Sequence, residues 1–399
     1  MKMNKIGDIN HKNILLLQGP MGFFFKRLDQ LFRSKGANTY RIGFNAGDAF
    51  FSYRDNYTPY RGTRKNWAGF IEDFLHQNNI DQIYLFGDCR FYQSQAIQIA
   101  RAMGLDVFVF EEGYIRPNYI TLEKFGVNNF SLMSRDRLFY DTLDLEGLPD
   151  PKAEDTYFSA TKMILSAMTY YFMGNVFHFL YPNYEHHRGF SGLREAYFGI
   201  RNFYRKQKYK ITEKNLMERL VIERKGQYFF VPLQTHNDFQ ILQHSGYGSI
   251  EKFIIEVIES FSLNAPQENT LLFKHHPVDR GRMDFSNFIR IQAEKYGVSE
   301  RVNVVHDLHL PTCLQHAKGT ITINSTVGLS SIFHETPVIT LGYALYDIEG
   351  LTNKGVKLED FWHTQVSPDM ELYEKYRRYL IKNSQLNASF YGKIPTFND

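Results

Sequence analysis

The chain has little of what marks several common protein classes. Only two of its 399 residues are cysteines, Cys89 and Cys313, and they lie far apart. Two distant cysteines exclude a disulfide scaffold and offer no structural zinc spacing, which suits the reducing cytoplasm. Residues 1–12 are polar and lack the apolar segment of a signal peptide. We therefore expect a cytoplasmic protein.

The chain also lacks a large net charge and the common short motifs of nucleotide-binding and esterase sites. The formal net charge is +3, which is too small to indicate a nucleic-acid-binding protein by itself. No Gly-x-Gly-x-x-Gly or Walker sequence marks a nucleotide site, and no Gly-x-Ser-x-Gly elbow marks an esterase. We expect no nucleic-acid partner and none of these motif-defined sites.

The chain is long enough for more than one domain and is rich in apolar and aromatic residues. A length of 399 residues predicts two domains of ordinary size. Hydrophobic residues make up 43% and charged residues 22%, which is enough for proper cores and excludes a disordered chain. The aromatic content of 16% indicates either carbohydrate or membrane-interface contacts, or only an AT-rich genome.

Both halves repeat strand–loop–helix units, which favour parallel sheets flanked by helices. In the first half we expect strands at 13–17, 38–44, 82–86 and up to Glu111, with helices at 23–34, 67–77 and 91–103. In the second half we expect strands at 227–232, 270–273, 302–305, 319–323 and 337–341, with helices at 249–262, 285–296 and 327–333. The predicted fold class is α/β, with two Rossmann-like domains (1–155 and 226–399) facing a cleft and a helical, basic-aromatic insertion (156–225) between them.

The insertion holds two segments that concern membranes. Residues 163–181 carry no Lys, Arg, Asp or Glu but many aromatics, and they lack the Leu/Ile/Val core of a spanning helix. A buried helix is our first interpretation of this segment, and an interfacial helix is the second. From Arg188 to Lys210, basic residues alternate with Tyr and Phe. This pattern is typical either of a surface that binds anionic headgroups or of a solvated helix face.

Carboxylates follow two predicted strands of the first half. Glu111 and Glu112 end an apolar run and precede Gly113, and Asp88 follows the strand at 82–86. Ligands of open α/β sheets bind beyond the carboxyl ends of the strands, so these groups are candidates for a base or a nucleophile. Because neighbouring strand residues point in opposite directions, we expect only one glutamate to face the cleft. Asp88 is expected beside Glu112. An ion pair with Arg116 is the structural alternative.

Cationic and hydroxyl groups follow strands of the second half. Lys274, His275, His276 and Pro277 succeed an apolar run, and Pro277 holds His276 in an extended conformation that suits an anion. Adjacent histidines face opposite ways and no third ligand stands at a recognisable spacing, so a metal site is not expected.

Small polar residues follow another strand of the same half. Asn324, Ser325 and Thr326 start a predicted helix, where they can bind phosphate or only cap the helix. Gln234 follows the strand at 227–232 and can reach the cleft.

Three strings carry a resemblance to a known family. They are Glu111–Pro117 (Glu-Glu-Gly-Tyr-Ile-Arg-Pro), Lys274–Pro277 (Lys-His-His-Pro) and Asn324–Leu329 (Asn-Ser-Thr-Val-Gly-Leu). They resemble capsule polysaccharide biosynthesis proteins of the KpsS/LipB type, as do residues 18–20, 232–234 and 350–352. The resemblance extends from residue 13 to residue 355. It implies a GT-B-like glycosyltransferase.

That family implies a β-Kdo transferase. It moves Kdo from CMP-β-Kdo to a phosphatidylglycerol-type lipid, with retention, and starts the poly-Kdo linker of a capsular polysaccharide. The resemblance implies that the first string supplies the catalytic carboxylate, although the family often has Glu-Asp-Gly where this chain has Glu-Glu-Gly. A double displacement requires a carboxylate nucleophile, for which Glu112 is our first choice and Asp88 the second. It assigns CMP binding to the His-Pro and Ser/Thr strings. Arg116 is the expected partner of the sugar carboxylate.

The resemblance also sets expectations about partners. No cofactor and no metal are expected, and the partners are CMP-Kdo, a lipid acceptor at the inner face of the cytoplasmic membrane and other capsule biosynthesis or export proteins. Two alternatives stay open. One is transfer of sialic acid, and the other is a non-catalytic subunit of capsule assembly or export.

Overall fold

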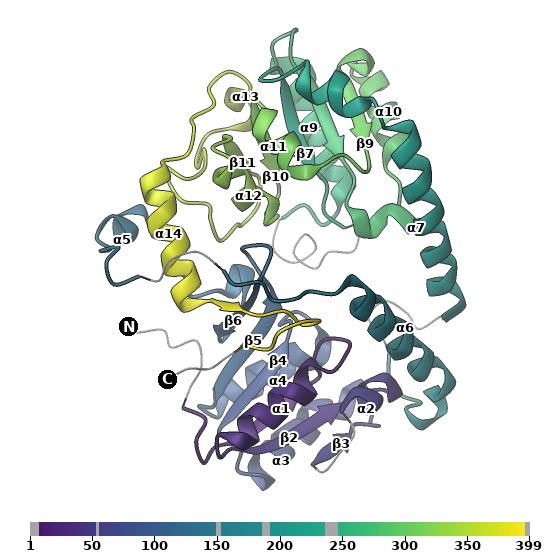
Figure 1. The fold of residues 1–399 in the computed structure, drawn as a ribbon, viewed down its shortest axis with the longest axis vertical. Helices are drawn as coiled ribbons and strands as arrows, with labels where there is room; N and C mark the ends of the chain where they lie inside the picture. The colour runs from purple at the N-terminus through teal and green to yellow at the C-terminus, as the bar shows by residue number, and fades with distance from the viewer. Residues whose placement is uncertain (1–7, 53–55, 149–152, 186–191, 236–245, 396–399) are drawn as a thin grey trace. The chain divides into compact units, whose positions relative to one another are not determined.

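The computed structural model describes residues 8–52, 56–148, 153–185, 192–235 and 246–395 (Figure 1). Contacts between Cα atoms divide the chain into two compact units. Unit 1 comprises Met1–Leu132, Leu148–Gly192 and Arg378–Asp399, and unit 2 comprises Met133–Gly147 and Leu193–Arg377. These bounds differ from the expected breaks after residues 155 and 225, because the insertion is divided between the units and the C-terminal segment returns to unit 1.

Unit 1 contains a seven-stranded sheet in the order β12-β6-β5-β4-β1-β2-β3. Five strands run parallel: β1 (Asn13–Leu17), β2 (Asn38–Gly43), β3 (Tyr57–Pro59), β4 (Gln82–Phe86) and β5 (Asp106–Glu112). At one edge β6 (Tyr119–Lys124) pairs antiparallel with β5, and β12 (Gln385–Asn387) pairs antiparallel with β6. The expected parallel sheet is therefore mixed at this edge.

Helices cover both faces of this sheet because its strands alternate two sets of apolar side chains. Phe108 and Phe110 of β5 pack with α1 (Phe24–Ser34), whereas Val107 and Val109 pack with α3 (Trp67–Gln77) and α4 (Phe91–Ala102). This is a doubly wound arrangement. Unit 1 also contains α2 (Ala46–Ser52), α6 (Ala160–Val176), η1 (Arg64–Asn66), η2 (Asn128–Phe130) and η3 (His178–Leu180).

Unit 2 contains a five-stranded sheet in the order β11-β10-β7-β8-β9. Its strands are all parallel: β7 (Tyr228–Pro232), β8 (Thr270–Lys274), β9 (Val302–Val305), β10 (Gly319–Thr322) and β11 (Val338–Thr340). The buried runs that predicted these strands lie in the sheet as expected, because both of its faces are covered.

Two layers of helices bury the second sheet. One core joins it to α9 (Ile250–Asn264), α10 (Ser286–Lys295) and α13 (Leu358–Phe361), and the other joins it to α11 (Leu310–His316) and the π-helical η4 (Glu218–Ile222). The remaining elements are α5 (Arg137–Asp141), α7 (Gly192–Thr212), α12 (Val327–Phe333), α14 (Met370–Asn383), η5 (Pro277–Gly281) and η6 (Ser299–Arg301). The predicted α/β fold class is confirmed for each unit.

The apolar segment at 163–181 is not the buried helix that we expected first. It forms α6 and η3, and many of its apolar side chains are exposed, including Ile164, Met168 and Phe172. Composition indicates an apolar helix but does not tell whether another element covers it. Within the described residues, every helix is too short or too polar to cross a bilayer.

The strand orders locate a topological switch point in each unit. In unit 1 the chain runs outward from β1 to β2 and β3, and then to β4 and β5 on the other side of β1. In unit 2 it runs from β7 to β8 and β9, and then to β10 on the other side of β7. Open α/β sheets bind ligands beyond the carboxyl ends of strands that flank such a point. The relevant edges are therefore those after β1/β4 and after β7/β10.

Candidate functional site

Each sheet has a polar cluster at the carboxyl ends of its central strands. In unit 1 the cluster contains Asp88 after β4 and Glu111 and Glu112 at the end of β5. In unit 2 it contains residues that follow β7, β8, β9 and β10. The residues that we selected from the sequence thus lie at the sheet edges where ligands bind.

The two glutamates of β5 point to opposite sides of the sheet. Glu111 lies on the side of Val109, which packs with α3 and α4, and Glu112 lies on the side of Phe110, which packs with α1. Glu111 is half-buried and Glu112 is exposed. Burial nevertheless raises the pKa of the Glu112 carboxyl, and the charge of Arg116 opposes this. The pair therefore offers two carboxyl groups that differ in exposure.

Glu111 has the electrostatics of an acid/base group. Burial raises the pKa of its carboxyl to about 7, although a hydrogen bond from the backbone N–H of Glu112 to Oε1 (3.0 Å) and the charge of Arg90 oppose this. The charges of Glu112 and Asp88 raise the pKa further. A carboxyl that titrates near neutral pH can take up or release a proton under cellular conditions.

Asp88 is buried and already holds a loop. Its Oδ2 accepts a hydrogen bond from the N–H of Val127 at 2.9 Å, and its Oδ1 accepts one from Sγ of Cys89 at 3.0 Å. Its charge raises the pKa of both Glu111 and Glu123, whereas we expected Asp88 beside Glu112. Asp88 is therefore better placed to raise the pKa of Glu111 than to attack a substrate.

Sequence reasoning missed two members of this cluster, Glu123 and Tyr114. Burial raises the pKa of Glu123 on β6 to about 7, and Oγ of Ser384 donates a hydrogen bond to it at 2.8 Å. The buried hydroxyl of Tyr114 accepts a hydrogen bond from the N–H of Asn128 at 2.6 Å and also bonds to Glu123. Only a prediction of the antiparallel strand β6 would have placed Glu123 here.

Arg116 lies near Glu112 and is anchored by its own backbone segment. Its Nε donates a hydrogen bond to the carbonyl oxygen of Gly113 at 3.1 Å, and its positive charge acts on Glu112. Arg116 is exposed. A guanidinium held in this way keeps donors for an incoming carboxylate.

His276 forms the cap of η5 directly after β8. Its backbone is extended (φ −72°, ψ 133°), and its Nδ1 accepts a hydrogen bond from the N–H of Val278 at 3.2 Å. Pro277 occupies the first position of the helix, where a missing N–H is tolerated. This tautomer leaves the proton on Nε2, so the half-buried ring can donate a hydrogen bond to an anion.

Lys274 and His275 point into the protein. Nζ of Lys274 donates a hydrogen bond to the carbonyl oxygen of His306 at 3.3 Å, and burial lowers the pKa of this lysine. Burial also lowers the pKa of His275 to about 4, so its ring is neutral. We expected both residues to bind donor, but neither side chain is exposed.

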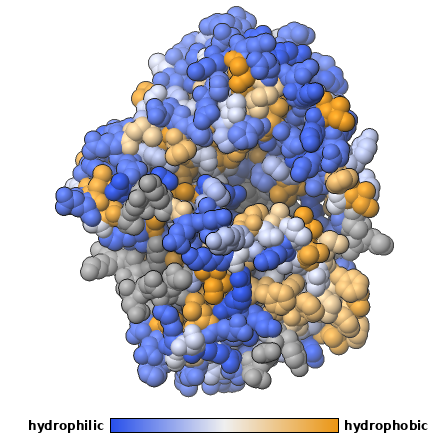
Figure 2. Space-filling model, viewed as in Figure 1, coloured by the Kyte–Doolittle hydropathy of each residue, from blue (hydrophilic) through white to orange (hydrophobic). Residues whose placement is uncertain are grey.

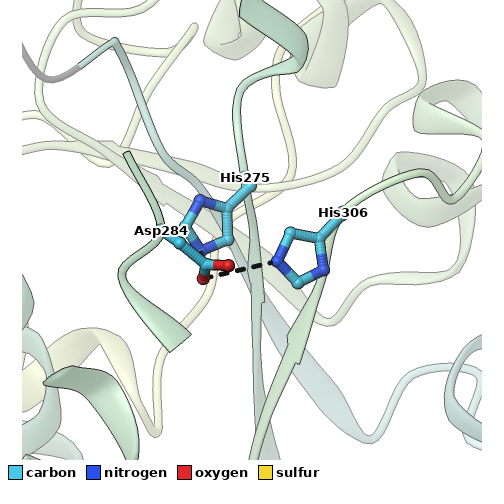
Figure 3. A group of neighbouring side chains, drawn as sticks. All are labelled: His275, Asp284 and His306. Atoms are coloured by element: carbon cyan, nitrogen blue, oxygen red, sulfur yellow. Dashed lines mark ion pairs between the residues drawn. The ribbon is translucent and has the colours of Figure 1, made fainter. Parts of the chain in front are cut away.

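His275, Asp284 and His306 form a group that could hold a metal ion (Figure 3). One ligand atom from each lies within 4.8 Å of the others. Asp284 Oδ1 is 3.7 Å from Nε2 of His275 and 3.6 Å from Nε2 of His306. No spacing in the sequence indicates this group, because its residues come from three separate loops.

The ring geometry of this group favours a hydrogen-bonded stack over a metal centre. The two imidazoles are nearly parallel (8°) with centroids 4.6 Å apart, so their lone pairs lie in nearly parallel planes and do not converge on one ion. The backbone N–H of Phe285 also donates to Nε2 of His275 at 3.3 Å. Our expectation that the site needs no metal stays a prediction.

His306 links this stack to two carboxylates and to α7. Its Nδ1 lies 2.8 Å from Oε1 of Glu213, and its ring stacks on Tyr209 at 3.8 Å. Burial alone lowers the pKa of His306, but hydrogen bonds to Asp284 and Glu213 outweigh this effect and raise it. These contacts fix the loop after β9 to α7 and to the loop that carries Asp284.

The polar residues after β10 meet those after β7. Nε2 of Gln234 donates a hydrogen bond to Oδ1 of Asn324 at 3.0 Å, across the switch point. Oγ of Ser325 accepts from the N–H of Val327 at 3.2 Å, so Ser325 caps α12, whereas Thr326 makes no side-chain cap. Asn324, Ser325 and Thr326 are all half-buried.

Comparison with known proteins decides the family. Residues 81–391 match the family described as capsule polysaccharide biosynthesis protein. Over 383 residues the chain is 42% identical to the capsule polysaccharide export protein KpsS of Escherichia coli, covering 96% of this chain and 98% of that protein. The chain belongs to the capsule polysaccharide biosynthesis protein family. The resemblance that its three strings indicated is confirmed.

Another curated relative agrees with this placement, and one solved structure shows a distant likeness. The capsule polysaccharide modification protein LipB of Neisseria meningitidis serogroup A is 36% identical over 404 residues, with 96% of this chain and 92% of that protein covered. A solved KpsC β-Kdo 2,7 transferase structure from Thermosulfurimonas dismutans covers 91% of this chain and 98% of its own, at 12% identity and a TM-score of 0.40. This identity and this TM-score are too low for substrates or residue roles to be transferred to the chain.

Proposed function

We propose that this member of the capsule family is a glycosyltransferase that moves Kdo from CMP-β-Kdo onto a phosphatidylglycerol-type lipid. Transfer occurs with retention and starts the poly-Kdo linker of a capsular polysaccharide. The observation that carries the proposal is the pair at the end of β5, an exposed Glu112 beside Glu111, whose carboxyl has a pKa raised to about 7 by burial. Two carboxyl groups with different environments suit a double displacement.

The donor binds in unit 2 in this proposal. His276 and the Gln234–Asn324 pair lie at the carboxyl edge beside the switch point, where a CMP phosphate and nucleoside can be held by hydrogen bonds. Lys274 is buried and bonded to the His306 carbonyl, so it acts through its charge and not by direct contact. CMP is a good leaving group, and hydrogen-bond donors and the positive charge of unit 2 can stabilise its phosphate, which is why we propose that no metal or other cofactor takes part.

The chemistry proceeds in two steps. A carboxylate oxygen of Glu112 bonds to the anomeric carbon of Kdo while the bond from that carbon to the phosphate oxygen breaks, and CMP leaves with the electron pair. The acceptor hydroxyl then attacks the same carbon, its proton passes by way of water to Glu111 on the other side of β5, and Glu112 departs as a carboxylate. Two inversions give net retention. Arg116, beside Glu112, pairs with the carboxylate of Kdo.

Incubation of the pure protein with CMP-Kdo and a fluorescent phosphatidylglycerol tests the proposal. We expect a product that migrates as the acceptor plus Kdo, with one CMP released for each sugar transferred. The same assay with a CMP-sialic acid donor separates Kdo transfer from sialic acid transfer. A folded protein that releases no CMP and transfers neither sugar would refute catalysis.

The alternative is a non-catalytic role in capsule assembly or export. It is favoured by the name of the Escherichia coli relative, which is called an export protein. Copurification of other capsule biosynthesis or export proteins from cells in which Glu112→Gln replaces the natural chain would distinguish the roles. A catalytic protein loses capsule in that strain although its partners are still bound, whereas a scaffold keeps capsule.

We place the protein at the inner face of the cytoplasmic membrane, where a lipid acceptor is met. Part of the basic-aromatic stretch supports this: Tyr197, Phe203, Tyr204, Lys206, Lys208 and Lys210 are exposed on α7. Other members turn inward, because Tyr209 is buried and Arg205 bonds to the Arg280 carbonyl at 3.0 Å. Arg188 lies outside the described residues. Each basic residue near an anionic surface adds about 1 kcal/mol, so attachment through α7 should weaken with salt.

A further inference from the structure

One side of α6 is an uncovered apolar stripe. Ile164, Met168, Phe172 and Val176 recur every four residues, and their exposed fractions are 54%, 64%, 64% and 48%. Residues four apart lie on one side of a helix, so these side chains form a continuous row along α6. Water-soluble surfaces rarely leave such a row open unless it contacts a partner or a membrane.

Neighbouring elements of unit 1 extend this row into a patch. α2 packs against α6, and Phe50 of α2 and Phe23 before α1 are 43% and 46% exposed. Figure 2 shows apolar side chains gathered over the α2 and α6 region of the molecule. Leu165 and Phe179 are exposed as well, at 57% and 70%. We call this surface, which consists of Ile164, Leu165, Met168, Phe172, Val176, Phe179, Phe23 and Phe50, the α6 patch.

The opposite side of α6 is fixed to the sheet. Tyr170 is buried, and its hydroxyl oxygen accepts a hydrogen bond of 2.6 Å from Nδ2 of Asn45, which follows β2. A Cβ added to Gly47 of α2 would lie 2.7 Å from the Tyr170 ring, so the two helices touch closely. The α6 patch is thus a rigid feature at the carboxyl edge of the first sheet.

The charges around the patch suit an anionic surface. No Asp or Glu occurs between residues 156 and 184, whereas Lys162 lies on α6. Lys26 lies over the Phe23 ring at 5.6 Å from its centroid. Asp48 of α2 and Asp29 of α1 are buried, so the exposed charged side chains of these helices are basic. Apolar and aromatic side chains with exposed basic residues among them are typical of helices that lie in a membrane interface.

We propose that the α6 patch is seated in the headgroup region of an anionic lipid bilayer. The helix has 17 residues, or a length of about 25 Å, and its hydrogen-bonded Tyr170 keeps the inner side on the protein. It therefore lies along the membrane surface and does not cross it. Only the role of this contact, which is to bring a lipid acceptor to the enzyme, rests on the proposed function.

The patch adjoins the candidate carboxylates within unit 1. Gly22 lies between Ser166 of α6 and Tyr391, since a Cβ there would be 3.2 Å from Oγ of Ser166 and 3.7 Å from the Tyr391 ring. The charge of Glu112 acts on Tyr391. A lipid headgroup held at the α6 patch would thus lie near the glutamate that we propose as nucleophile.

Vesicle sedimentation with two triple variants tests the proposal. The first, Ile164→Ser/Met168→Ser/Phe172→Ser, removes the centre of the patch. The control, Leu263→Ser/Ile291→Ser/Val366→Ser, makes the same kind of change at side chains of unit 2 that are 76%, 45% and 66% exposed. On vesicles containing phosphatidylglycerol, we expect the patch variant to bind about tenfold more weakly or worse, and the control to bind like the natural chain.

A labelled variant reports the contact directly. An environment-sensitive fluorophore on Met168→Cys should brighten and shift to the blue on adding these vesicles, whereas the same label on Leu263→Cys should not. Far-UV circular dichroism and the thermal unfolding midpoint of the patch variant should equal those of the natural chain, which shows that it folds. Vesicle binding is measured without sugar transfer, so a failure of the proposed activity leaves this test decisive.

Three results would overturn the proposal. The patch variant could bind vesicles as tightly as the control, or the label on Met168→Cys could stay unchanged on vesicles. The third is a change of oligomeric state in the patch variant, measured by sedimentation velocity, without a loss of vesicle binding. That result would assign the patch to a second copy of the chain.

Discussion

Nε2 of Gln234 donates a hydrogen bond to Oδ1 of Asn324 at 3.0 Å and thereby joins the loops after β7 and β10. The N–H of Asn324 points back to Oε1 of Gln234 at 3.5 Å. These two strands flank the switch point of the second sheet, where nucleotides bind in open α/β folds. The amide pair therefore holds the floor of the proposed donor site in a fixed shape.

Asn324→Asp should weaken CMP binding. The carboxylate has the same shape and still accepts from Gln234, but it places a negative charge where we propose that a phosphate binds. We expect the dissociation constant for CMP to rise about tenfold or more in isothermal titration, and the loss to shrink at high salt. Asn287→Asp, at an exposed position of α10, is the matched control. Equal CMP affinity in both variants would remove Asn324 from the donor site.

His276 has two roles that can be separated by substitution. His276→Ala loses the acceptor for the Val278 N–H and the donor for the phosphate. His276→Asn restores a capping acceptor but not the imidazole. We expect the alanine variant to unfold more easily by about 1 kcal/mol and the asparagine variant to recover most of that stability. Both should bind CMP more weakly. Recovery of CMP binding by asparagine would mean that His276 acts only as a cap.

Some parts of this site could be predicted from the sequence, and others could not. The buried runs Leu15–Leu17, Val107–Phe110 and Leu271–Phe273 predicted central strands because a covered parallel strand must be apolar throughout. The polar residues that follow these strands must therefore lie at the edge of the sheet. The glutamates and His276 were found by this route.

The other features of the site depend on pairing between segments far apart in the sequence, so they could not be predicted. β12 pairs with β6 across more than half of the chain, so neither the mixed sheet edge nor the Glu123–Ser384 contact leaves a local pattern. His275, Asp284 and His306 meet only because three loops converge. α6 was recognisable as an apolar helix, but its exposure depends on what surrounds it.

The two glutamates of β5 should respond differently to isosteric substitution. Glu112→Gln removes the proposed nucleophile, so we expect Kdo transfer to be abolished while CMP binding stays nearly intact. If substantial turnover remains, Asp88 becomes the leading nucleophile. The measurement is release of CMP in a single turnover, with isothermal titration of CMP as the control for folding.

Glu111→Gln should alter the pH dependence of transfer. The general base must be deprotonated, so we expect the rate of the natural enzyme to rise with pH through about 7, where the Glu111 carboxyl titrates. In Glu111→Gln the rate of transfer should be lower and should not rise as the pH passes through about 7. A variant that keeps the inflection near pH 7 would assign it to another group.

Chelation should leave transfer unchanged. A monophosphate donor and the cations of unit 2 require no metal, and the stacked rings of His275 and His306 do not converge on an ion. We expect full activity in excess EDTA after dialysis. A complete loss that magnesium, manganese or zinc restores would contradict a metal-free site. If zinc then failed to restore activity in Asp284→Asn, the ion would be assigned to the group of His275, Asp284 and His306.

The buried carboxyl of Glu123 should make the folded state less stable as the pH rises. Its pKa is raised from 4.5 to about 7, so between these values the folded state binds more protons than the unfolded state. Stability then falls with pH and the loss is complete above about 7. Glu123→Gln has no proton to lose. We expect its free energy of unfolding, from urea titrations at pH 5 and pH 8, to fall less over this range than that of the natural chain. Glu300→Gln, at an exposed position, should follow the natural chain. A parallel fall in all three proteins would mean that Glu123 is ionised in the folded state at both pH values.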